Sequence, residues 1–182
     1  MTTTATAVAP ATAVAPATAD ATATAVTRAG VGRHWETRLF SDPDLPGRRW
    51  AAPSYDGVDD LLADARGRLV RVSARAAYQE ALHGRALLVD IRPAAQRAAE
   101  GEVARHLSPL VVERNVLEWR FDPRHEARLP VATFDARVVV LCQEGYTSSL
   151  AADSLLRLGI RRATDVVGGF RAWREAGLPV AS

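Results

Sequence analysis

The chain of 182 residues contains no lysine and only one cysteine, Cys142. A single cysteine excludes a disulfide within the chain, and it excludes a cysteine-rich zinc site, which needs several thiolates. The histidines are far apart and lack the spacing of metal ligands. They are His34, His83, His106 and His125. We therefore expect no metal site and no other cofactor.

Long apolar runs and a one-sided charge are missing as well. No stretch approaches the roughly 20 apolar residues of a membrane span, and the N-terminus lacks the basic and apolar blocks of a secretory signal. The chain carries 23 basic and 21 acidic side chains, and its arginines are scattered rather than clustered. These absences predict a cytoplasmic protein that binds neither a membrane nor nucleic acid.

The first third of the sequence differs from the rest in composition. Residues 1–27 are rich in Ala and Thr, with Asp20 as the one charged side chain before Thr27. Ordering such a segment gains little against backbone entropy, so we expect a disordered tail. Residues 28–57 combine Pro and Gly with large aromatic side chains, which predicts an irregular arm that partly packs on the domain. An arm that binds a protein partner is the alternative.

Residues 58–182 alternate short helical and strand patterns, and 48% of the whole chain is apolar, which is ample for a core. This alternation predicts an α/β fold with a central parallel sheet flanked by helices on both faces. Helices are expected at 58–66, 74–84, 91–101, 148–159 and 168–179. Strands are expected at 69–72, 86–90, 108–116, 137–141 and 163–167, and a turn at 116–123.

Local signals refine three of these helices. Ser73 is a suitable N-cap for the second helix, and Pro93 suits the first position of the third. Asp153 and Arg157 are four residues apart, so we expect them to pair on an exposed helix edge.

Cys142 and Asp90 each follow an apolar strand, "RVVVL" and "ALLV". In parallel sheets ligands bind beyond the carboxyl ends of the strands, so both residues are site candidates. The loop after Cys142 is short, and Gly145 allows it to curl towards the helix that starts near Ser148. Inward-facing N–H groups in such a loop would bind an anion and favour the thiolate of Cys142. The alternative is an inert, buried thiol.

Three motifs together resemble a single-domain rhodanese, a sulfurtransferase: "LLVDIRP", "CQEGYTS" and "DVVGGFRAWREAGLPV". The resemblance covers about residues 70–180. It implies that Cys142 accepts a sulfane sulfur from thiosulfate or a related donor as a persulfide, and passes it to a thiol or to cyanide. The substrate-binding loop would then consist of Gln143, Glu144, Gly145, Tyr146, Thr147 and Ser148.

Asp90 and Arg92 match the Asp-x-Arg of the rhodanese family. Two interpretations stay open for them: a tie between this strand end and the active loop, or a local salt bridge. The chain also departs from the family. Members commonly have a Gly-His-Ile-Pro-Gly-Ala stretch after this strand, whereas "GEVARHL" keeps Gly101 and replaces most of the rest. Glu144 stands where many thiosulfate-using members have a basic residue, so we expect weak use of thiosulfate. "GGF" at 168–170 indicates close packing of a helix start rather than a phosphate site.

Two other functions compete with sulfur transfer. A related phosphatase would need His before the cysteine and Arg six positions after it, but this chain has Leu141 and Ser148 there. A phosphoryl transition state needs that cation. A non-catalytic binding or redox-sensing module is the second competitor, with Cys142 oxidised to a sulfenic acid that a partner thiol would resolve.

Overall fold

The apolar run before Cys142 forms a central strand of a parallel sheet. The computed structural model describes residues 54–181, where this run is β4 (Val138–Leu141). It lies between β1 (Leu87–Asp90) and β5 (Thr164–Asp165). The strand β3 (Leu110–Val111) pairs with the other edge of β1. The order is β3-β1-β4-β5, and every pairing is parallel.

Every residue of β4 is fully buried because both faces of the sheet are covered. Val138 and Val140 belong to one apolar cluster, and Val139 and Leu141 belong to the cluster on the opposite face. Alternate side chains of a strand point to opposite faces, so a strand between two layers must be apolar throughout. The continuous run "VVVL" therefore follows directly from its place in the sheet.

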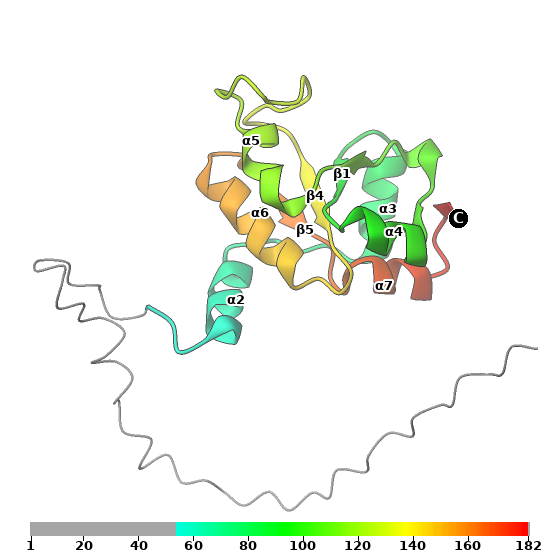
Figure 1. Ribbon diagram of the computed structural model, residues 1–182, viewed down its shortest axis with the longest axis horizontal. Helices are drawn as coiled ribbons and strands as arrows, with labels where there is room; N and C mark the ends of the chain where they lie inside the picture. The colour runs from blue at the N-terminus through cyan, green and yellow to red at the C-terminus, as the bar shows by residue number, and fades with distance from the viewer. Residues whose placement is uncertain (1–53, 182) are drawn as a thin grey trace, which may run out of the picture. The chain divides into compact units, whose positions relative to one another are not determined.

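Helices cover both faces, as the sequence predicts. In Figure 1, α5 and α6 lie on one side of the strands, and α3 and α7 lie on the other. The helix α2 contacts α6. The helices are α2 (Val58–Gly67), α3 (Ala74–Leu82), α4 (Ala94–Glu100), α5 (Leu117–Phe121), α6 (Thr147–Arg157) and α7 (Gly169–Glu175), with short 3-10 turns η1 (Arg105–Leu107) and η2 (Arg114–Val116).

The strand expected at 69–72 is reduced to one bridge. Val72 pairs in parallel with Val166, through bonds from its N–H to Asp165 and from Val167 to its carbonyl. The chain leaves α2 at Gly67 and enters α3 at Ala74, with Ser73 accepting the N-cap bond from Ala76, as predicted. The N–H groups of Arg68 and Leu69 still bond to carbonyls of α2, so only the end of the linker pairs with the sheet.

The segment 108–123 differs most from the expectation. Only Leu110 and Val111 pair as a strand, because Ser108 has a left-handed backbone (φ 49°) and Pro109 has no N–H to donate. Most of the residues expected to form a turn at 116–123 are helical instead, since η2 ends at Val116 and α5 runs to Phe121. Leu117 and Phe121 are four residues apart and fully buried, so α5 forms to place both in the core.

Two smaller differences concern the segment after β1. Pro93 occupies the position before α4 rather than its first residue. The divergent stretch that begins at Gly101 forms β2 (Glu102–Val103), which pairs antiparallel with β6 (Val180–Ala181). The sequence patterns indicated neither of these two-residue strands.

The predicted tail 1–27 lies outside the described residues, as does the arm up to residue 53. At the described end of the arm, Tyr55 is half-buried and donates a hydrogen bond to Asp64 of α2 (2.6 Å). Within residues 54–181 no helix has the length and apolar character to cross a membrane. In the same range, no three His, Cys, Asp or Glu side chains gather as metal ligands would.

Candidate active site

A pocket of about 650 Å³ opens where three neighbouring strands end. Arg92 follows β1, Glu113 follows β3 and Cys142 follows β4, and all three line the pocket. In the chain, β1 is followed by β3, which lies on one side of it, and then by β4, which lies on the other side. The carboxyl ends of these strands therefore meet at a topological switch point. Open parallel sheets bind ligands at such points. Both predicted strand-end candidates lie here, with Asp90 buried behind Arg92.

The thiol of Cys142 is cradled by the loop that follows it. Its Sγ accepts hydrogen bonds from the backbone N–H groups of Gly145 (3.2 Å) and Ser148 (3.3 Å). Ser148 lies in the first turn of α6, whose dipole adds positive potential at this end. Cys142 is 8% exposed and lines the pocket. The thiol is thus open on one side and held by amide donors on the other, which is the nest that the sequence predicts.

A buried polar network lies directly beneath the sulfur. Sγ is 3.2 Å from Ser148 Oγ, and that hydroxyl donates to Asp165 Oδ2 (3.0 Å). Asp165 is fully buried at the end of β5, and it accepts two bonds from Arg71 (2.7 and 2.9 Å) and one from Ser149 (2.8 Å). The carboxylate is therefore neutralised and fully bonded, as a buried charge must be.

Two arginines hold the loop from behind. The carbonyl of Gly145 accepts bonds from Arg66 (2.9 Å) and Arg71 (3.0 Å). These bonds fix the carbonyl of Gly145, while its N–H, which belongs to the preceding peptide group, faces the sulfur. Residue 145 must be glycine, because φ is +78° and a Cβ would lie 2.8 Å from the nitrogen of Gly168.

The start of α7 packs against the same loop. Phe170 and Arg171 donate backbone N–H bonds to the carbonyls of Cys142 (2.8 Å) and Gln143 (3.0 Å). A Cβ on Gly169 would collide with the Cys142 carbonyl, and its φ is +59°. Gly168 and Gly169 therefore serve the close packing of this helix start, as the sequence predicts.

Asp90 and Arg92 satisfy both interpretations that the sequence left open. They form a bidentate salt bridge (2.7–3.1 Å) in which both side chains are buried. Arg92 also lies 3.5 Å from Gln143 Oε1 and stacks on Phe170, with its guanidinium carbon 3.6 Å from the ring centroid. The pair is local, and it connects the end of β1 with the loop and with α7.

The remaining predicted loop residues divide between the rim and the interior. Gln143, Glu144, Tyr146 and Thr147 line the pocket, whereas the side chain of Ser148 is buried below it. Glu144 forms an ion pair with Arg171 (2.5 Å) in which both side chains are about half exposed. This partner weakens the repulsion of anions that the sequence analysis assigned to Glu144.

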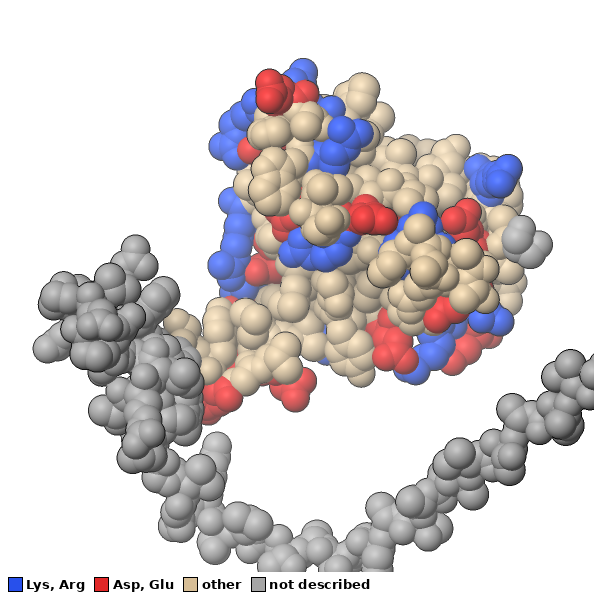
Figure 2. Space-filling model, viewed as in Figure 1, with Lys and Arg blue, Asp and Glu red and all other residues tan. Residues whose placement is uncertain are grey.

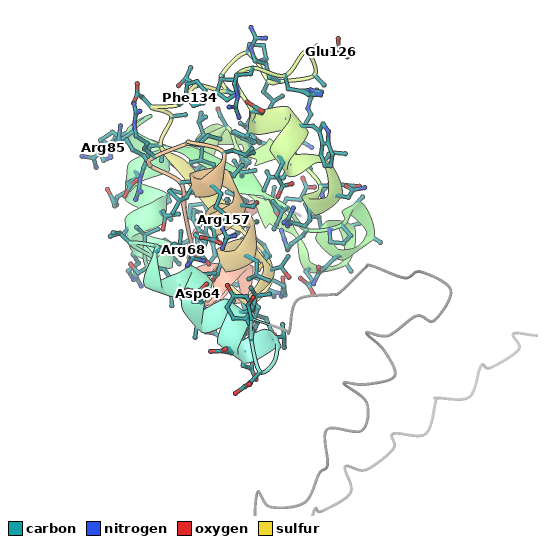
Figure 3. The ribbon with its side chains drawn as sticks, turned by 90° about the vertical axis from the view of Figure 1, so that its left-hand side faces the viewer. Asp64, Arg68, Arg85, Glu126, Phe134 and Arg157 are labelled. Atoms are coloured by element: carbon teal, nitrogen blue, oxygen red, sulfur yellow. The ribbon has the colours of Figure 1, made fainter. Side chains whose placement is uncertain are left out.

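Asp153 pairs with Arg157 as predicted, but the expected exposed edge is wrong. The Asp153 side chain is only 8% exposed, because α2 packs over it and Arg68 binds both carboxylate oxygens (2.6 and 3.0 Å). Figure 3 shows Arg68 beside Asp64 and Arg157 at this helix contact. The hydrogen bonds from Arg68 hold the pKa of Asp153 below its ordinary value against the opposing effect of burial.

The sequence patterns do not identify several residues of the site. Arg66 and Arg71 lie far from Cys142 in the chain, so no local motif identifies them. Asp165 ends β5 and Glu113 lies just after β3, but the strands expected at 163–167 and 108–116 placed both residues inside a strand, so the rule applied to Asp90 did not select them. The further lining residues are Gln96, Arg114 and Asn115.

The fold and the site together define the class of protein. It is an α/β domain with a parallel sheet, in which a single cysteine follows a central strand and lies in a loop whose N–H groups face the thiol. The profile of the rhodanese-like domain family matches residues 73–176. The chain therefore belongs to the rhodanese-like domain family.

Two curated relatives carry sulfurtransferase names. Thiosulfate sulfurtransferase GlpE of Vibrio cholerae is 33% identical over 94 residues, which are 51% of this chain and 76% of that protein. Adenylyltransferase and sulfurtransferase MOCS3-2 of Zea mays is 36% identical over 89 residues, 49% of this chain and 17% of the maize protein. The similarity to the maize protein thus concerns one part of a much longer chain.

Solved structures agree with the fold. A protein of unknown function from Rhodopseudomonas palustris, described as a "possible tyrosine phosphatase", is 26% identical with a TM-score of 0.63. The alignment covers 72% of this chain and 98% of that one.

Proposed function

We propose that this protein is a sulfurtransferase that carries a sulfane sulfur as a persulfide on Cys142. One observation carries the proposal: Sγ accepts two backbone N–H bonds, from Gly145 and Ser148, while its side chain lines the pocket. A thiolate is the reactive form of cysteine, and preorganised amide donors stabilise negative charge on sulfur.

In the first half-reaction the Cys142 thiolate attacks the outer sulfur of thiosulfate or a related donor. A bond forms between Sγ and that sulfur, and the bond between the two donor sulfurs breaks. Sulfite leaves with the electron pair and needs no acid, because it is a stable anion. No second nucleophile, metal or base is required for this step.

In the second half-reaction an acceptor removes the outer sulfur. A thiolate or cyanide attacks it, and Cys142 leaves as the thiolate that began the cycle. The loop amides stabilise the leaving thiolate in this step as they do the attacking thiolate in the first. Gln143, Glu144, Tyr146 and Thr147 surround the approach to the sulfur, so they are the side chains that meet the donor and the acceptor.

Phosphatase activity is the competing enzymatic function, since one similar structure carries that description. Six positions after the cysteine, where an arginine would bind the phosphoryl group, Ser148 donates its hydroxyl to buried Asp165. A serine at this position supplies no cation to the phosphoryl transition state. We expect no hydrolysis of an aryl phosphate.

The test is sulfur loading followed by turnover. Purified protein is incubated with thiosulfate, and its intact mass is compared with that of Cys142→Ser. We expect a gain of about 32 Da, one sulfur atom, in the wild type only, and thiocyanate formation once cyanide is added. The same adduct on both proteins would refute the assignment of Cys142. No adduct with any sulfane donor would favour the non-catalytic module.

A further inference from the structure

The pocket above Cys142 is much larger than an inorganic sulfur donor. Its volume is about 650 Å³. Pockets of this size generally hold small organic molecules, in a range of roughly 300–1,000 Å³. Thiosulfate would leave most of the volume to water.

The arginines of the lining are already neutralised. Arg92 is bound by Asp90 (2.7 Å) and also lies 3.4 Å from Glu100. Arg114 pairs with Glu118 (2.8 Å). Neither arginine offers an unpaired charge to a dianion, so the side chains that line the pocket add little to the positive potential of the loop amides and the α6 dipole.

The other charged side chains of the lining are acidic. Glu144 is paired with Arg171, but among residues 54–181 Glu113 pairs with no arginine or histidine. Arg66 also has no carboxylate partner among residues 54–181. It does not line the pocket, however, because it lies behind the loop and donates hydrogen bonds to Gly145 and Ser149. Figure 2 shows acidic and basic side chains interspersed over the visible face.

We propose that the pocket takes an organic persulfide, or the corresponding thiol, that carries a cationic group such as an ammonium, and that Glu113 determines this specificity. The inference rests on the proposed function. The Cys142 thiolate attacks the terminal sulfur of the persulfide RSSH, the bond between its two sulfurs breaks, and RS⁻ leaves with the electron pair. The reverse reaction delivers sulfur to the same thiol.

Each part of such a molecule meets a matching part of the pocket. The reacting sulfur lies against the amides of Gly145 and Ser148, where negative charge is stabilised. The organic portion contacts the apolar surface of Ile91, Pro93 and the Tyr146 ring. The cation faces Glu113.

The first experiment measures the charge preference of the pocket without sulfur transfer. Cys142 is the only thiol in the chain, so its reaction with 2-aminoethyl and 2-sulfonatoethyl methanethiosulfonate gives a cationic-to-anionic rate ratio for this site alone. The ratio is compared in the wild type, Glu113→Gln and the control Glu126→Gln. Glu126 stands on an exposed loop far from α2 in Figure 3 and does not line the pocket.

We expect Glu113→Gln to lower the ratio by roughly threefold at low salt, the effect of one exposed charge interaction, and Glu126→Gln to leave it unchanged. A ratio for Glu113→Gln equal to that of the control overturns the proposal.

The second experiment uses the persulfide form with thiols of similar length: cysteamine, 2-mercaptoethanol and 3-mercaptopropionate. The rate with cysteamine is divided by the rate with 3-mercaptopropionate for each variant. The intrinsic reactivities of the two thiols cancel when this ratio is compared between variants. We expect this ratio to fall by roughly threefold in Glu113→Gln, and an unchanged ratio contradicts the inference. If no donor forms the persulfide, the proposed function itself fails, whereas the methanethiosulfonate ratio still reports the charge preference separately.

Discussion

Replacing Asp165 by Asn tests the buried network beneath the active loop. The carboxylate is fully buried and accepts four hydrogen bonds, two from Arg71 and one each from Ser148 and Ser149. The amide removes the negative charge and one acceptor oxygen while it keeps the shape. The Arg71 guanidinium then remains in the interior without its counter-ion.

The expected cost follows from the burial of the two partners. Removing one member of a buried ion pair costs about 3–5 kcal/mol. The Arg71 side chain is 17% exposed and can gain some hydration, so we expect about 3 kcal/mol of unfolding free energy, near the lower end. For a domain of this size that corresponds to a fall in Tm of roughly 10 °C.

The assay is urea unfolding followed by far-UV circular dichroism, with Asp135→Asn as the matched control. Asp135 pairs with Arg161 on the surface, with both side chains at least 70% exposed, so the control should lose less than about 0.5 kcal/mol. Adding Arg71→Met to Asp165→Asn should recover about 1–3 kcal/mol, because the unpaired charge is gone. A loss within about 1 kcal/mol of the control would show that this network does not stabilise the domain.

Three further variants test separate parts of the structure. Gly169→Ala should destabilise the protein by about 1–3 kcal/mol, through its positive φ and the collision with the Cys142 carbonyl, and an unchanged Tm would contradict this. The lowered pKa of Asp153 stabilises the folded state fully at pH values above the unfolded pKa, 3.8, and this stabilisation is lost as the pH falls through the folded pKa. Asp153→Asn should therefore cost about 1–2 kcal/mol of unfolding free energy at neutral pH. In urea unfolding, the difference between this variant and the wild type should shrink below pH 3.8. Glu144→Arg should lower KM for thiosulfate by roughly two- to fivefold, and steady-state kinetics with an unchanged or raised KM would refute the charge argument.

The fold was accessible from the sequence where burial leaves a clear pattern. The run "VVVL" is apolar at every position because helices cover both faces of β4, and this pattern identifies a central parallel strand. The segment 108–123 was not accessible in the same way. Its helix α5 is short, and it forms because two buried side chains, Leu117 and Phe121, fit a core that the local sequence does not describe.

The residues of the site likewise divide into those that the sequence identifies and those that it does not. Cys142, its loop and Asp90 follow from the rule that ligands lie beyond the ends of parallel strands. The partners that hold the loop do not follow from it, because Arg66 and Arg71 come from a segment more than 70 residues away in the chain. Likewise the burial of Asp153 depends on α2 packing over α6, which the spacing of Asp153 and Arg157 does not reveal.

Intact-mass spectrometry after exposure to a sulfane donor tests the central claim most directly. We expect the wild-type chain to gain about 32 Da and to lose it again when a thiol is added, while Cys142→Ser gains nothing. A wild-type chain that stays at its original mass with every donor, although Cys142 reacts with a thiol reagent, would contradict the persulfide mechanism.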